Sequence, residues 1–110
     1  MEFKSNIDKN MIWEKDNLLR KDYVKVHILF KIANIMDWLK KHDKNRKIYE
    51  KIIEICNKYP KNENMLIFKI KSLRKLNRTY RSLECIENLL EINPYNRPAL
   101  LMIACICEGE

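Results

Sequence analysis

Two prolines set 34 residues apart constrain the fold of this chain more than any other feature of its sequence. Pro60 and Pro94 are surrounded by residues that align at the same offset. A fixed period of this length is typical of stacked helical hairpins. The sequence therefore predicts a scaffold built from repeated pairs of helices. The aligned pairs are Ile52 with Ile86, Ile55 with Leu89, Tyr59 with Asn93, and Asn62 with Asn96.

The period also divides the chain into consecutive segments. Its 110 residues are the size of one ordinary domain, so we expect a single domain over residues 1–110. Within it we expect a leading helix in residues 1–28, a first repeat over 29–62 and a second repeat over 63–96. The remaining segment, 97–110, has room for one closing helix.

Composition and pattern both favour an all-α fold. Charged residues make up 34% of the chain and hydrophobic residues 46%, glycine occurs once, and no segment alternates apolar and polar residues as a half-buried strand does. Short connections make neighbouring helices antiparallel hairpins. We expect about six helices, over Ile7–Lys21, Val24–Lys41, Asn45–Tyr59, Glu63–Leu76, Thr79–Ile92 and Arg97–Cys107.

Helix starts and buried faces can be predicted from the same segments. Asn62 and Asn96 each precede a helix, where an asparagine side chain accepts hydrogen bonds from first-turn amides. Within Val24–Lys41, apolar residues recur at helical spacing, so we expect this stripe to face the core. The members of the stripe are Leu29, Ile32, Ile35, Met36 and Leu39.

The second repeat resembles the tetratricopeptide repeat, and the first repeat resembles it more weakly. Over residues 29–107 the resemblance implies a right-handed stack of antiparallel helical hairpins, with two repeats between a leading and a closing helix. The stretch from Ser82 to Leu100 is also similar to the second repeat of tail-anchored mitochondrial fission adaptors. The glycine that the family places between its two helices is absent here. In the second repeat the resemblance is carried by Leu66, Ile70, Leu73, Lys75-Leu76-Asn77, Tyr80, Ser82, Ile86, Leu89 and Leu90–Pro94.

The resemblance implies that the first helix of each pair lines a concave groove with an apolar floor and a basic rim. Such a groove suits an acidic or amphipathic segment of a partner protein. Alternatively, Ile67 and Phe68 are buried against the N-terminal helix. Asp37 and Phe68 stand where chaperone-tail binders of the family carry asparagine, which disfavours that ligand. The expected lining residues are Phe30, Ala33, Asn34, Asp37, Lys41, Ile67, Phe68, Lys71, Arg74, Lys75, Leu101, Met102 and Cys105.

A net charge of +7 points in the same direction, because the excess of basic residues lies in residues 23–110. Basic clusters attract acidic peptides, anionic lipid or RNA phosphates, although a solvated surface has the same composition. We therefore expect a non-enzymatic interaction module, with an RNA- or ribosome-associated factor as the alternative. The clustered residues are Lys40, Lys41, Lys44, Arg46, Lys47, Lys69, Lys71, Arg74, Lys75, Arg78 and Arg81.

An enzyme ranks third, because no motif for chemistry stands out. Cys105 and Cys107 are two positions apart, and on a helix such residues point in different directions, so we expect no metal site. His27 and His42 lack a nearby nucleophile pattern. Gly109, the single glycine, cannot build a phosphate loop, and we expect no cofactor.

The cysteines and the N-terminus predict the cellular setting. Cys56, Cys85, Cys105 and Cys107 lie at apolar helix positions, where we expect them to pack as free, small hydrophobic residues. The N-terminus lacks the apolar stretch of a signal peptide. Both observations favour a reducing, intracellular and cytoplasmic location.

The closing helix has an unusual composition. The stretch Ala99–Cys107 contains nine residues and none is polar, which is too short for a membrane span of about 20 residues. The last unit of a free-standing solenoid needs a polar outer face. We therefore expect a partner chain, a second copy of this chain or a segment outside this sequence to cover it. Alternatively, the N-terminal helix folds back over it.

Overall fold

The computed structural model describes the backbone of residues 2–108 and the side chains of residues 17–105 apart from His42. Within these residues the chain is entirely helical apart from its connections, so the all-α prediction is confirmed. The described helices are α1 (Glu2–Trp38), α2 (His42–Cys56), α3 (Glu63–Lys75), α4 (Thr79–Ile92) and α5 (Arg97–Glu108).

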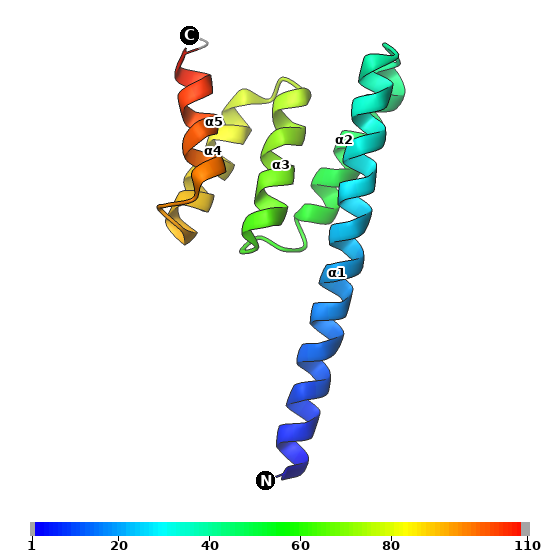
Figure 1. The fold of residues 1–110 in the computed structure, drawn as a ribbon, viewed down its shortest axis with the longest axis vertical. Helices are drawn as coiled ribbons and strands as arrows, with labels where there is room; N and C mark the ends of the chain where they lie inside the picture. Colours follow the sequence, from blue (N-terminus) through cyan, green and yellow to red (C-terminus); the bar gives the residue numbers. More distant parts are fainter. Residues whose placement is uncertain (1, 109–110) are drawn as a thin grey trace.

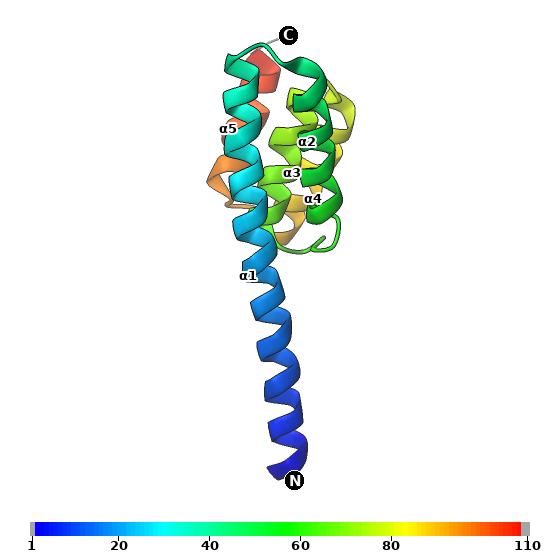
Figure 2. The same ribbon diagram turned by 90° about the vertical axis from the view of Figure 1, so that its right-hand side faces the viewer.

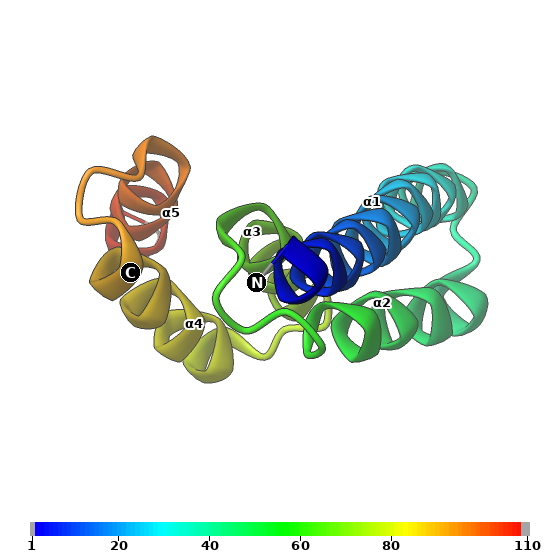
Figure 3. The same cartoon turned by 90° about the horizontal axis from the view of Figure 1, so that it is seen from below.

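The five helices form two layers. Figure 3 shows α1, α3 and α5 in one layer and α2 and α4 in the other. Each helix packs on its neighbours in sequence, and α1 also contacts α3. Figure 1 places α1 and α5 at opposite edges of the molecule, with α3 between them, and the N-terminal part of α1 extends beyond the other helices (Figures 1 and 2).

The predicted pair of helices over Ile7–Lys21 and Val24–Lys41 is wrong, because the single helix α1 runs through the first segment and continues through the second as far as Trp38. The sequence between them contains no proline or glycine that would end a helix. Asp22, at the expected break, accepts a hydrogen bond from the hydroxyl of Tyr59 instead of capping a new helix.

Because α1 runs along the edge opposite α5, it does not fold back over the closing helix in the described residues (Figure 1). That alternative for covering α5 is therefore wrong. Among the helices that the structure describes, none has both the length and the apolar character that crossing a bilayer requires.

The predicted caps at the starts of α3 and α5 are confirmed. Asn62 Oδ1 accepts a hydrogen bond from the Met65 amide at 3.1 Å, and Asn96 Oδ1 accepts one from the Ala99 amide at 3.0 Å. Each bond satisfies a first-turn amide that has no partner within its helix. The 34-residue period therefore corresponds to a repeated structural feature, the start of a first-layer helix.

The ends of α1 and α3 also share one geometry. Lys40 and Asn77 adopt left-handed backbone conformations, with φ of 61° and 60°. The following amides, of Lys41 and Arg78, reach back to the carbonyls of Met36 and Leu73, each at 2.9 Å. This is the Schellman arrangement, which satisfies carbonyls at a helix C-terminus.

These two helix ends lie 37 positions apart, whereas the caps lie 34 apart. The first hairpin therefore has three more residues between its turn and the next cap, and the buried positions of α1 shift accordingly. The offset of 37 pairs Leu29 with Leu66, Ala33 with Ile70, and Met36 with Leu73.

This shift makes the predicted core stripe of α1 wrong in part. Ile32, Ile35 and Leu39 are exposed by 38%, 57% and 51%. Val26 and Ala33 instead face the core, and both are fully buried. Small and β-branched side chains at these positions allow α2 and α3 to approach α1 closely.

Two clusters of buried side chains form the core. The first joins α1, α2 and α3, and α3 contributes Met65 and Phe68 to it. The second joins α3, α4 and α5, and α3 contributes Leu66, Ile70 and Leu73. Ser82, expected at the small-residue position of the second repeat, is fully buried in α4, where its hydroxyl donates to the Thr79 carbonyl at 2.6 Å.

Candidate functional site

A hollow of about 550 Å³ lies between α1 and α3. Phe30 and Asn34 line it from α1, and Lys71, Arg74 and Lys75 line it from α3. All five residues are among those that the sequence predicts for the groove. Two helices that are separated by α2 in the sequence thus bring an aromatic ring, an amide and three cations to one place.

Phe30 lines this hollow and belongs to a cluster of aromatic rings, which we call the aromatic base. Phe30 and Phe68 meet edge to face, with ring centroids 5.5 Å apart, and Tyr23 and His27 contact Phe68 at 5.9 and 5.8 Å. Such pairs add stabilisation beyond simple burial. Phe68 is only 9% exposed, so the expectation that its ring lines a groove is wrong, and the alternative that it is buried against the N-terminal helix is correct.

Ile67 is half-buried and packs against the second core cluster. Tyr23 and His27 were not predicted as part of this region. Together with Phe30 they have the spacing i, i+4 and i+7, which places three rings along one side of a helix. That spacing is the sequence signal that would have identified the aromatic base.

Lys71 holds a positive charge above these rings. Its Nζ atom lies 5.8 Å from the centroid of the Phe30 ring and 6.0 Å from that of Phe68. An ammonium group over an aromatic face is attracted by the ring electrons. This contact orients the Lys71 side chain over the hollow, while the residue remains exposed to solvent.

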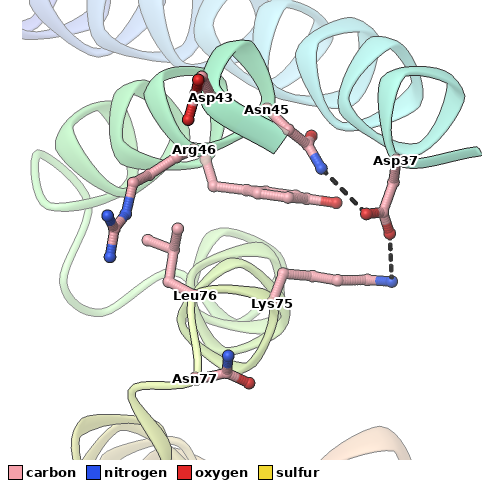
Figure 4. Close-up of a pocket in the computed structure, with 8 residues that line it drawn as sticks. Asp37, Asp43, Asn45, Arg46, Lys75, Leu76 and Asn77 are labelled. Atoms are coloured by element: carbon pink, nitrogen blue, oxygen red, sulfur yellow. Dashed lines mark hydrogen bonds and ion pairs between the residues drawn. The ribbon is translucent and has the colours of Figure 1, made fainter. Parts of the chain in front are cut away.

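Lys75 is held at the other end of the hollow by Asp37 (Figure 4). Its Nζ atom lies 3.4 Å from Asp37 Oδ2, and Asp37 Oδ1 accepts a hydrogen bond from Asn45 Nδ2 at 3.2 Å. Both partners of the ion pair are substantially exposed, so it contributes little to stability. Its effect is to position Lys75 and to offset its charge, which leaves Lys71 and Arg74 as the main cations of the rim.

A second hollow, of about 320 Å³, adjoins this ion pair where the α1–α2 turn meets the end of α3 (Figure 4). Tyr49 is one of its lining residues, and its hydroxyl donates to Asn34 Oδ1 at 3.3 Å. Burial raises the pKa of Tyr49, and the nearby negative charge of Asp37 raises it further. The hydroxyl therefore stays protonated and fixes the Asn34 amide. The lining residues are Asp37, Asp43, Asn45, Arg46, Tyr49, Lys75, Leu76 and Asn77.

Other predicted site residues do not join Phe30 and Lys71. Lys41 is exposed in the α1–α2 turn and lines neither hollow. Leu101, on α5, is 60% exposed. Met102 is 7% exposed within the second core cluster and Ala33 is fully buried in the first, so both are wrong as lining residues.

The cysteines divide into two environments. Cys56 and Cys85 are buried as expected, and burial raises the pKa of the Cys56 thiol to about 12 and also raises that of Cys85. Cys105 is exposed, which contradicts its expected burial, and Cys107 lies outside the described side chains. The thiols of Cys56, Cys85 and Cys105 are free. Among the described residues, no group of three or more His, Cys, Asp and Glu side chains is placed to hold a metal ion.

Of the two histidines, His27 is exposed and takes part in the aromatic base, while the side chain of His42 lies outside the described residues. No family model, curated protein or solved structure matches this chain.

Proposed function

We propose that this chain is a non-enzymatic interaction module that binds an acidic or amphipathic segment of a partner protein in the hollow between α1 and α3. We further propose that its helices form a right-handed, tetratricopeptide-like stack. One observation carries the proposal. Phe30 and Asn34, from one predicted repeat, and Lys71, Arg74 and Lys75, from the next, line a single hollow.

The chemistry of these side chains supports a ligand with both carboxylates and apolar groups. The planar fork of Arg74 suits bidentate bonds to a carboxylate, and Lys71 offers a second, oriented charge. The Phe30 ring offers an apolar contact below them. An amphipathic segment satisfies both requirements, because its apolar side chain reaches the ring while its acidic neighbours reach the rim.

RNA association is the second candidate, and the net charge of +7 is the observation that favours it. Glutamates of the same chain offset part of this positive charge, however. Arg78 lies 2.9 Å from Glu50, and Lys51 lies 3.9 Å from Glu54. We therefore rank protein binding first.

We do not propose catalysis, since cations above an aromatic ring suit binding. An intracellular, cytoplasmic setting remains part of the proposal, supported by the free thiols of Cys56 and Cys85.

The test compares partner recovery by three forms of the full chain. The groove variant carries Lys71→Glu with Arg74→Glu, and the control carries Lys44→Glu with Lys47→Glu, an equal charge change on exposed residues of α2. Lys75 is left intact, because reversing it would place a second carboxylate beside Asp37. Affinity capture from the native cell with quantitative mass spectrometry reports the recovered proteins.

We expect wild type and control to recover the same partner and the groove variant to recover at least about tenfold less, since charge reversal places glutamates against the acidic segment and like charges at close range cost several kcal/mol. Equal recovery by all three forms would contradict the proposal. Loss of binding in both variants, with a steep salt dependence and sensitivity to nuclease, would favour RNA instead.

A further inference from the structure

A second surface, on the outer side of α1, has not been used in the proposed function. Five large aliphatic side chains there are 38–57% exposed. Their spacing of four, four, three and four residues keeps them on one side of a helix, within an arc of about 80° at about 100° per residue. We call this surface the outer stripe, and it consists of Val24, Ile28, Ile32, Ile35 and Leu39.

The outer stripe lies on the side of α1 away from the core. Val26 and Ala33, which are fully buried, occupy the opposite side at the same helical periodicity. Figures 1 and 3 show α1 at the edge of the molecule, with the other helices on one side of it. The helix thus has two apolar sides, and the chain itself covers one. A continuous exposed apolar surface of this kind marks an interaction site.

The charges that border the outer stripe are positive. Lys25 lies along one edge and Lys31 along the other, and Lys21 lies one turn before Val24; all three are exposed. The two carboxylates among the described side chains of α1 are engaged elsewhere. Asp22 binds the Tyr59 hydroxyl, and Asp37 binds Asn45 and Lys75.

The positive charges and the width of the outer stripe indicate which kind of molecule it binds. A second copy of the same stripe would bring lysines against lysines in either orientation, and like charges at close range are unfavourable. A membrane-surface helix presents a broad apolar face, whereas an arc of about 80° is the narrow seam typical of paired helices. The stripe therefore fits a helix of opposite charge.

We propose that the outer stripe docks an amphipathic helix of a partner protein, with aliphatic residues along one side and glutamate or aspartate along both edges. The distance from Val24 to Leu39 along the axis is about 22 Å, which corresponds to a partner helix of about 16 residues. Each acidic edge faces lysines of α1, as in the flanking positions of coiled coils. The surface is separate from the hollow and goes beyond the proposed function.

Trp38 provides a direct readout. Its side chain is 82% exposed and follows Ile35 by three residues, so it borders the stripe. The chain contains two tryptophans, and the variant Trp13→Phe leaves Trp38 as the single indole. Desolvation of Trp38 by a docked helix shifts its fluorescence to shorter wavelengths.

The probe is a synthetic 18-residue peptide with leucines spaced four, three and four residues apart and glutamates on both sides of them. The matched control peptide has the same composition with its leucines distributed around the helix. We expect the first peptide to produce a saturable shift of Trp38 emission and the control peptide to produce none. Absence of a saturable shift with the first peptide would overturn the proposal.

Three variants in the Trp13→Phe chain locate the contact. Ile28→Gln with Ile35→Gln should weaken binding at least tenfold, and circular dichroism should be unchanged because both residues are exposed. Lys25→Glu with Lys31→Glu should lower the affinity for the acidic peptide and raise the affinity for a peptide in which lysines flank the leucines. Lys44→Glu with Lys47→Glu, which reverses two exposed charges of α2, should leave the affinity unchanged. The stripe variants keep Lys71 and Arg74 intact, so this test and that of the proposed function can fail independently.

Two other outcomes would replace the proposed occupant. Conversion of a dimer to a monomer by Ile28→Gln with Ile35→Gln, in analytical ultracentrifugation, would show that a second copy covers the stripe. A Trp38 shift with phosphatidylglycerol vesicles, but not with the acidic peptide, would show that the stripe binds an anionic membrane surface. Either result would overturn the proposal that a partner helix docks on the outer stripe.

Discussion

At the scale of single residues, the contact between Tyr59 and Asp22 fastens the α2–α3 connection to the middle of α1. The Tyr59 hydroxyl donates to Asp22 Oδ2. Burial raises the pKa of Tyr59 to about 12, and the hydrogen bond and the negative charge of Asp22 contribute to the increase. The proton of this hydroxyl is therefore held more tightly in the folded chain than in the unfolded chain.

This difference predicts a loss of stability in alkaline solution. Tyrosine in an unfolded chain ionises near pH 10, so above that pH the unfolded state loses a proton that the folded state retains until about pH 12. The contribution of Tyr59 is therefore complete below pH 10 and declines between pH 10 and 12.

Replacement of Tyr59 by phenylalanine tests this point. At pH 8 we expect the wild type to exceed Tyr59→Phe in free energy of unfolding by about 1 kcal/mol, the usual net value of one hydrogen bond. At pH 11 the gap should shrink, because only the wild type carries the shifted hydroxyl. Urea denaturation at both pH values measures it, and a gap that does not change with pH would contradict the assignment.

At the scale of helices, apolar residues of similar hydrophobicity occupy opposite environments. Leu89 in α4 is fully buried, whereas Ile35 in α1 is 57% exposed. We expect Leu89→Asp to lower the free energy of unfolding by more than about 3 kcal/mol, because it buries an unpaired charge and leaves a cavity. Ile35→Asp should change it by no more than about 0.5 kcal/mol.

Thermal and urea unfolding of the two variants, followed by circular dichroism, give this comparison. The pair is informative because both substitutions introduce the same side chain. If Ile35→Asp proved as damaging as Leu89→Asp, the outer stripe would belong to the core, and the exposed face of α1 described above would be wrong.

The two residues also show how far the sequence could predict the fold. The buried faces of α3 and α4 followed from the resemblance and from the period. The resemblance to the tetratricopeptide repeat places Leu66 and Ile70 in the core, the period pairs Leu89 with Ile55, and all four residues are buried. The buried face of α1 could not be predicted in this way, because three additional residues in the first hairpin shift the positions that are buried. Nothing in the pattern itself separates an apolar stripe that packs within the chain from one, such as that of Ile35, that remains at the surface.

Prediction of the candidate site was limited for a related reason. Phe30, Lys71 and Arg74 were predicted because the resemblance implies that the first helix of each pair lines a groove, and all three residues line the hollow. The burial of Phe68 and Met102 depends on how closely neighbouring helices approach, which is set by side chains from other segments. The Asn45–Asp37–Lys75 contacts likewise join three helices and have no local signal.

At the scale of the whole molecule, the exposed side of the closing helix remains without a cover in the described residues. Leu100 and Leu101 on α5 are 47% and 60% exposed, while Ala99 and Met102 pack against the second core cluster. Adjacent leucines are therefore left in water. That a partner chain, a second copy of this chain or a segment outside this sequence covers them stays a prediction, and the second copy is the cover that the purified chain can test.

Self-association through α5 should depend on concentration and on these two leucines. In multi-angle light scattering we expect the apparent mass of the wild type to rise with concentration. Leu100→Ser with Leu101→Lys should restore a monomer, and Ile28→Gln with Ile35→Gln, on the opposite edge, should have no effect. Hydrogen exchange over residues 97–105 should become faster in the α5 variant. A wild type that remains monomeric at all concentrations would exclude a second copy as the cover.

The position of α3 between the two core clusters has a consequence for how the molecule transmits stability. Met65 and Phe68 belong to one cluster, and Ile70 and Leu73 belong to the other. The two core clusters therefore both include side chains of α3. In repeat proteins, cooperativity passes between units through such shared neighbours. A ligand held between α1 and α3 would therefore slow amide exchange in α4, a helix that does not line the hollow, because opening α4 exposes the other side of the element that the ligand holds.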